Sequence, residues 1–96
     1  MKFRVTQAAR GDLEQIWRYI AERWGREQAD LYIDRLVLRF AWLAANPGLW
    51  HARPEVGVGI CSWVETSHVI FFSSKRAVIN ILRVLHGHMN PAGRVG

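Results

Sequence analysis

In the first half of the chain, apolar and polar residues alternate over a few positions, and the apolar residues then recur with the period of a helix. Residues 2–6, KFRVT, alternate as a short strand does, and Thr6 is of a residue type that caps helices. Apolar residues, of which Trp24 is the last, then recur every three or four positions until Gly25 ends the pattern. A second apolar stripe, which includes Tyr32, covers residues 26–45 and stops at NPG, residues 46–48. This pattern predicts a strand followed by two helices, which one intervening glycine joins as a hairpin.

The second half carries three runs of β-forming residues. Residues 48–58 have no usable period and contain a proline and further glycines, so they are predicted to form a loop. The runs GICSWVE, SHVIFFSS and AVINILRVLH follow, with residues 73–76 as the predicted hairpin turn. We expect one α+β domain spanning residues 1–96, in the order β-α-α-β-β-β. Its small, antiparallel-rich sheet would carry the helical hairpin on one face, with residues 81–85 in the central strand.

Composition and cysteine usage favour a soluble globular protein. Half of the 96 residues are apolar, and five of them are tryptophans. The single Cys61 cannot form an internal disulfide, and the N-terminal residues lack the apolar run of a signal peptide. Charged residues interrupt every window long enough to cross a membrane. We therefore expect a cytoplasmic protein with no membrane partner.

The net charge of +5 is unevenly distributed along the chain. Residues 7–46 contain six basic and six acidic groups, which cancel, whereas the other segments contain seven basic groups and two acidic ones. The excess therefore lies outside the helical half. Such a one-sided field favours an acidic partner, either a nucleic acid or an acidic protein.

Arg83 interrupts the most apolar run of the chain, in the segment ILRVLHGHMN. On an alternating strand its side chain would share a face with Ile79, Ile81 and Leu85. The structural interpretation makes Arg83 an edge or interface residue, or the partner of a carboxylate such as Glu65. The functional alternative is a bidentate grip on a phosphate or on a partner's carboxylate.

His86 and His88 follow Arg83 closely, and Gly87 between them is expected to end the strand. Two histidines at this spacing can ligate a metal, but His51, His68 and Cys61 have no matching motif spacing, so we predict no metal site and no cofactor. An imidazole beside an arginine also suits general acid–base cleavage of a phosphodiester. Ordinary surface or interface histidines are the commoner outcome.

The segment after the second helix offers a further candidate site. Trp50, His51 and Arg53 could stack on bases or grip a partner helix, although covering one end of the core is the structural alternative. Cys61 is expected to be an inert, small apolar residue. The sequence contains no Gly-rich phosphate loop, no HExxH motif and no CxxC pair.

Four blocks of sequence resemble the ParE toxins of the RelE/ParE superfamily, the toxin halves of bacterial type II toxin–antitoxin pairs. They are AARGDLEQIWRYIAERWG (8–25), NPG (46–48), SHVIFF (67–72) and ILRVLHGHMN (81–90). The resemblance implies the fold expected above and an acidic, ParD-like antitoxin that lies across the toxin as a helix and a strand. It also implies poisoning of DNA gyrase by stabilisation of cleaved DNA. RelE relatives instead cleave mRNA on the ribosome.

The chain departs from this family pattern at three positions. Family members commonly carry arginine, tyrosine and arginine where this chain has Cys61, Phe72 and Ser73, and the chain has only two lysines. An RNA-cleaving site needs a cluster of such groups. We therefore expect gyrase poisoning by binding, without enzymatic chemistry and without direct sequence-specific DNA binding. The alternatives are a RelE-type mRNA interferase and a non-toxic homologue that only binds antitoxin. The predicted target- or antitoxin-binding residues are Arg83, His86, His88, Arg53, Trp50, Lys75 and Arg76.

Overall fold

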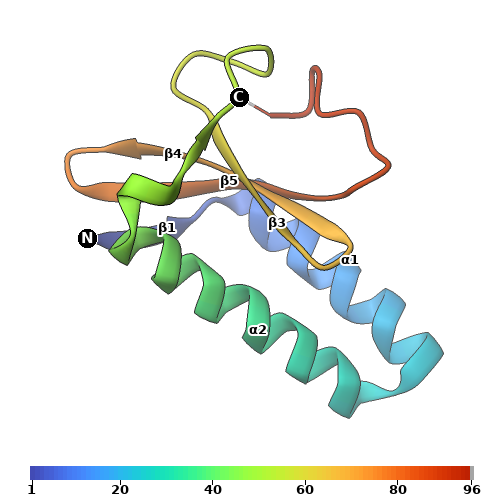
Figure 1. Ribbon diagram of the computed structural model, residues 1–96. Helices are drawn as coiled ribbons and strands as arrows, with labels where there is room; N and C mark the ends of the chain where they lie inside the picture. Colours follow the sequence, from blue (N-terminus) through green and yellow to red (C-terminus); the bar gives the residue numbers. More distant parts are fainter. Residues whose placement is uncertain (96) are drawn as a thin grey trace.

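The fold is a five-stranded mixed sheet that carries a helical hairpin on one face (Figure 1). The computed structural model describes residues 1–95. The strands are β1 (Lys2–Val5), β2 (His51–Ala52), β3 (Cys61–Glu65), β4 (His68–Lys75) and β5 (Val78–His86), in the sheet order β1-β5-β4-β3-β2. The helices are α1 (Gln7–Trp24) and α2 (Arg26–Ala45), followed by a short 3-10 turn, Pro47–Leu49. β1 runs parallel to β5, and the other neighbours are antiparallel. The predicted fold class and element order are confirmed.

Two details of the predicted sheet are wrong. The segment 48–58 is not entirely a loop, because His51 and Ala52 pair with Ser62 and Cys61 as a two-residue strand too short to show a period. The addition of β2 makes β4 the central strand, whereas residues 81–85 lie in its neighbour β5.

The helical hairpin begins and turns where the sequence predicts. The Thr6 hydroxyl oxygen accepts a hydrogen bond from the Ala9 N–H at 3.2 Å, which caps α1. The same hydroxyl is 2.8 Å from the carbonyl oxygen of Ile81, to which it donates, so the cap also ties α1 to β5. Gly25 has φ 94°, a value that glycine adopts easily, and it lets α2 begin one residue after α1 ends.

A bulge in β5 changes which side chains face the helices. Phe71 pairs with Arg83 but Phe72 pairs with Ile81, so Leu82 has no partner on β4. Ile81 therefore belongs to the core under the helices, whereas Leu85 lies in a small cluster on the opposite face with Phe71. The prediction that Arg83 shares one face with both Ile81 and Leu85 is wrong, because the extra residue breaks the alternation.

Two loops cover the face of the sheet that has no helices. The buried cluster on this face comprises Ile60, Phe71 and Leu85. Val56 packs on it from the loop after β2, and Val95 packs on it from the C-terminal segment. Both segments lie on the side of the sheet away from the helices in Figure 1.

The β4–β5 hairpin turns over two residues, rather than over the predicted 73–76. β4 continues through Lys75, and the turn residues Arg76 and Ala77 have φ values of 53° and 62°. Two positive φ values give a two-residue hairpin a backbone twist that matches its strands. Residues with a β-carbon are strained in this region.

Replacing Ala77 by glycine should therefore stabilise the protein. We expect Ala77→Gly to raise the free energy of unfolding by about 1 kcal/mol, because glycine has no β-carbon and adopts a positive φ without a steric clash. Ala41 on the exposed face of α2 provides the matched control, and Ala41→Gly should lower the same quantity by about 1 kcal/mol. Urea unfolding of the three proteins measures both changes, and a loss of stability in both variants would contradict a strained turn.

Candidate functional site

Arg83 is held by Asp12 of α1, rather than by the Glu65 that the sequence suggested. The guanidinium Nε and Nη2 each donate to one carboxylate oxygen of Asp12 at 2.7 Å. Asp12 also accepts the backbone N–H of Val84 at 2.9 Å. Glu65 instead pairs with Arg39 of α2, with 2.7 Å between Nε and Oε1.

This ion pair is located where β1 no longer covers β5. The partners of β1 end at Ile81, so the edge of β5 beyond that residue meets α1 instead. The Val84 N–H, which has no strand partner here, donates to the Asp12 carboxylate instead. Arg83 neutralises the negative charge of that carboxylate. The hydrogen bonds that Arg83 donates to Asp12 raise the pKa of Arg83 above its usual value. A carboxylate partner is one of the interpretations that the sequence leaves open for Arg83, and the structure shows that this partner is Asp12.

Loss of this ion pair should destabilise the whole fold. Arg83→Ala leaves the buried Asp12 carboxylate, whose side chain is 9% exposed, without its counter-ion. We expect the free energy of unfolding to fall by about 2 kcal/mol. Arg18→Ala, on the exposed side of α1, should change it by less than about 0.5 kcal/mol. Equal denaturant midpoints for the two variants would contradict a structural role for Arg83.

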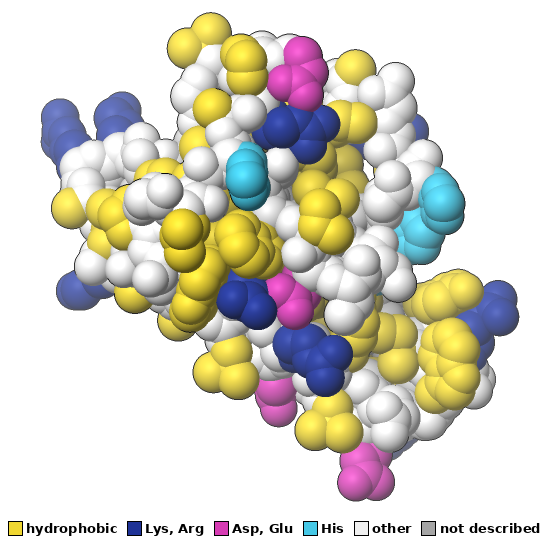
Figure 2. All heavy atoms as spheres, viewed as in Figure 1, with side chains coloured by type: hydrophobic (Ala, Val, Ile, Leu, Met, Phe, Trp, Pro, Cys, Tyr) yellow, Lys and Arg dark blue, Asp and Glu magenta, His cyan; other side chains and the backbone are white. Residues whose placement is uncertain are grey.

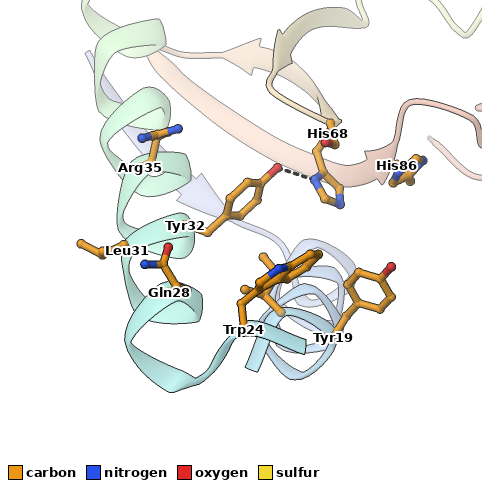
Figure 3. Close-up of a pocket in the computed structure, with 10 residues that line it drawn as sticks. Tyr19, Trp24, Gln28, Leu31, Tyr32, Arg35, His68 and His86 are labelled. Carbon is orange, nitrogen blue, oxygen red and sulfur yellow. Dashed lines mark hydrogen bonds between the residues drawn. The ribbon is translucent and has the colours of Figure 1, made fainter. Parts of the chain in front are cut away.

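A cleft of about 630 Å³ opens between the end of the helical hairpin and the β3–β4 turn. Figure 3 shows Tyr19 and Trp24 at the end of α1, opposite Tyr32, His68 and His86. Trp24 is 64% exposed, although its spacing placed it on the apolar stripe of the first helix. A hollow of about 320 Å³ shares Tyr19, His68 and His86 with the cleft and extends to Asp12, Arg83 and Met89. Exposed aromatic rings at a concave surface are typical of a binding site.

One hydrogen-bonded group fixes the wall of this cleft. The Tyr32 hydroxyl lies 2.6 Å from Nδ1 of His68 and 2.6 Å from the Thr66 hydroxyl, and Figure 3 shows Tyr32 pointing at the His68 ring. His68 is the cross-strand partner of His86, whose ring centroid is 5.5 Å away. The His86 ring stacks on His88 at 4.9 Å. The predicted pair of histidines is therefore part of a row of three.

The charged and titratable groups around the cleft favour a negatively charged ligand. Among the described residues that line it, the groups able to carry positive charge are Arg35, His68 and His86, and none is a carboxylate. Burial lowers the pKa of His68, the neighbouring His86 lowers it further, and Asp12 partly offsets both effects. Within residues 1–95, no group of three His, Cys, Asp or Glu side chains is placed to hold a metal ion.

The other predicted site residues lie away from this cleft. Trp50 donates from its indole N–H to the Leu43 carbonyl oxygen at 2.8 Å and packs against Phe72, so it covers one end of the core. Arg53 donates to the Ser62 hydroxyl at 3.1 Å. Lys75 and Arg76 lie at the hairpin between β4 and β5, at the opposite end of these strands from His68. The structure therefore brings together Arg83, His86 and His88 and separates them from the rest.

The three positions that depart from the family pattern lie on β3 and β4. Cys61 and Phe72 are cross-strand partners, and both contact the core beneath the helices. Burial raises the pKa of the Cys61 thiol, which keeps it protonated and unreactive at neutral pH. Ser73 follows Phe72 and pairs with Asn80 of β5.

The fold is similar to that of a solved toxin–antitoxin structure. A chain of the chromosomal ParDE TA system from P. aeruginosa superposes with a TM-score of 0.78 at 24% identity, covering 90% of this chain and 95% of that one.

No helix within residues 1–95 has the length and hydropathy needed to cross a membrane.

Sequence comparisons define the family. The model of the ParE toxin of the type II toxin–antitoxin system parDE matches residues 3–91. Toxin ParE1 of Caulobacter vibrioides is 34% identical over 94 residues, which cover 98% of this chain and 97% of that protein. Toxin ParE1 of Mycobacterium tuberculosis is 32% identical over 90 residues, covering 93% and 92%. The chain belongs to the ParE family of type II toxin–antitoxin toxins.

The depressed pKa of His68 predicts a loss of stability in acid. The unfolded chain binds a proton at the ordinary histidine pKa of 6.5, whereas folded His68 does so only at lower pH. The free energy of unfolding should therefore be largest above pH 6.5 and should fall as the pH drops from 6.5 to the lower folded pKa. His68→Gln should flatten this slope, and His51→Gln, at an exposed position, should leave it unchanged. Chemical unfolding at a series of pH values measures the slope, and a wild-type slope in His68→Gln would contradict this role.

Proposed function

We propose that the protein is a gyrase-poisoning toxin that is neutralised by an acidic, ParD-like antitoxin bound in the cleft of Tyr19, Trp24 and His68. The observation that carries this proposal is the combination of exposed aromatic rings with a lining in which, among the described residues, Arg35 is charged and no side chain is a carboxylate. An acidic amphipathic segment matches both properties, since its apolar side chains can cover the rings while a carboxylate approaches Arg35. Because the chain belongs to the ParE family, we expect this antitoxin to be of the ParD kind.

Poisoning by binding, without chemistry, agrees with the environment of Arg83. Its Nε and Nη2 donate to Asp12, and its Nη1 donates to the Arg94 carbonyl oxygen at 3.0 Å. A guanidinium with these bonds is poorly available to stabilise a pentavalent phosphate. Cys61 and Phe72 contact the core, and Lys75 lies at the far hairpin. These placements favour gyrase binding over mRNA cleavage.

The target is tested with purified gyrase, ATP and relaxed plasmid in the presence of this protein. We expect supercoiling to stop and linear DNA to appear after treatment with detergent and protease, because a poison traps the cleaved intermediate. Unchanged supercoiling at a large excess of folded protein would exclude gyrase as the target. A parallel ribosome assay that showed mRNA cleavage would establish the RelE-type alternative, and inactivity in both assays would favour a non-toxic homologue.

The antitoxin site is tested by truncating an aromatic side chain of the cleft. Trp24→Ala should weaken binding of the acidic antitoxin about 10- to 100-fold, because exposed tryptophans at concave surfaces are frequent hot spots. Leu49→Ala, an exposed apolar residue in the 3-10 turn, is the control and should leave the affinity unchanged. Isothermal titration calorimetry with each folded variant gives the result, and equal affinities would remove the cleft as the antitoxin site.

A further inference from the structure

Three of the five residues of β3 have no described strand beside them on the outer edge. β2 pairs only with Cys61 and Ser62, and among the described residues no strand adjoins Trp63–Glu65 on that side. Natural proteins protect such edges with lysine, proline or a bulge. Residues 63–65 contain no lysine, proline or bulge, their one charged side chain, Glu65, is buried, and the central residue Val64 is 68% exposed.

The exposed side of α2 adds an apolar surface next to this edge. Three contacts align α2 antiparallel to β3: Tyr32 bonds to Thr66, Arg39 pairs with Glu65, and Trp42 packs on Trp63 with ring centroids 4.9 Å apart. Leu38 lies next to Arg39 on this helix and is 71% exposed. Figure 2 shows hydrophobic side chains interleaved with basic and acidic ones over this part of the molecule.

The charges on this surface balance, although one of them, Arg35, also lines the cleft. Asp34 and Arg35 line the hollow along α2 together with Leu38, and Arg39 is already paired with Glu65. Two acidic and two basic groups leave no net field on a chain whose total charge is +5. An acidic partner gains no long-range attraction here, and a second copy of the chain meets no like-charge repulsion.

We infer that this surface, the edge of Trp63–Glu65 with Leu38 of α2, is a contact between two copies of the chain. The two edges pair antiparallel about a twofold axis through Val64, so Val64 faces its own counterpart and the two sheets become continuous. A twofold axis perpendicular to the sheet keeps both helical hairpins on one face. The α2 helices then approach each other, and Leu38 of each copy is covered. The inference goes beyond the proposed function and does not rest on it, because neither Trp63–Glu65 nor Leu38 lines the cleft.

The oligomeric state of the purified full chain tests this contact. Sedimentation velocity of the wild type should show a dimer that dissociates on dilution, with a dissociation constant on the order of micromolar, as for other small interfaces. Val64→Lys places a charge at the centre of the edge and should raise this constant at least 10-fold. Val58→Lys, at a fully exposed position in the loop after β2, is the matched control and should dimerise as the wild type does.

Leu38→Glu provides an independent second variant, because its exposed position on α2 leaves the strand and the core unchanged. It should weaken the dimer as Val64→Lys does, with an unchanged circular dichroism spectrum. A wild type that stays monomeric at all concentrations overturns the inference. A dimer that forms equally well in both variants also overturns it.

Discussion

The arrangement of α1 on the sheet depends on the hydrogen bonds that the Asp12 carboxylate accepts. This carboxylate accepts three hydrogen bonds, two from the Arg83 guanidinium and one from the backbone N–H of Val84. Without it, the part of β5 beyond β1 would carry an unpaired, buried N–H, which is costly in a protein interior. The same carboxylate fixes the position of α1 along the strand. One side chain thus provides both the missing edge partner of the sheet and the docking point of the helical hairpin.

The cleft follows from that docking. With α1 anchored by Asp12 and Thr6 near its start, its last turns extend past the sheet, and Figure 1 shows the hairpin tip beyond the strand ends. Tyr19 and Trp24 therefore stand exposed opposite His68, and Tyr32 closes the base of the cleft through its bonds to Thr66 and His68. Rigid aromatic and imidazole rings can contact a partner with little further loss of conformational entropy.

Every helix and strand of this fold except the two-residue β2 could be predicted from the sequence, because each has its own hydrophobic pattern and a clear stop signal, such as Gly25 or NPG. The bulge at Leu82 could not, since a single extra residue leaves no mark in a strand as uniformly apolar as β5. Nor could the sequence identify Asp12 as the partner of Arg83, because 71 residues separate them and Glu65 was an equally charged alternative.

The candidate site shows the same division. The sequence indicates His86 and His88 as candidates, because two imidazoles at the end of an apolar strand are unusual. It does not indicate Trp24 and Tyr32, because helical spacing places both on apolar stripes and cannot show that a helix extends past the sheet beneath it. Trp50 is a predicted binding residue, but its indole bonds to the end of α2 and covers the core.

The central claim is that a partner binds the cleft of Tyr19, Trp24 and His68. The most direct measurement is the amide chemical-shift map of isotope-labelled protein titrated with an acidic antitoxin of the ParD kind. The account predicts that the largest changes lie at the end of α1, the start of α2 and the β3–β4 turn. Changes confined to the loop after β2, the β4–β5 hairpin or the edge of β3 would contradict it.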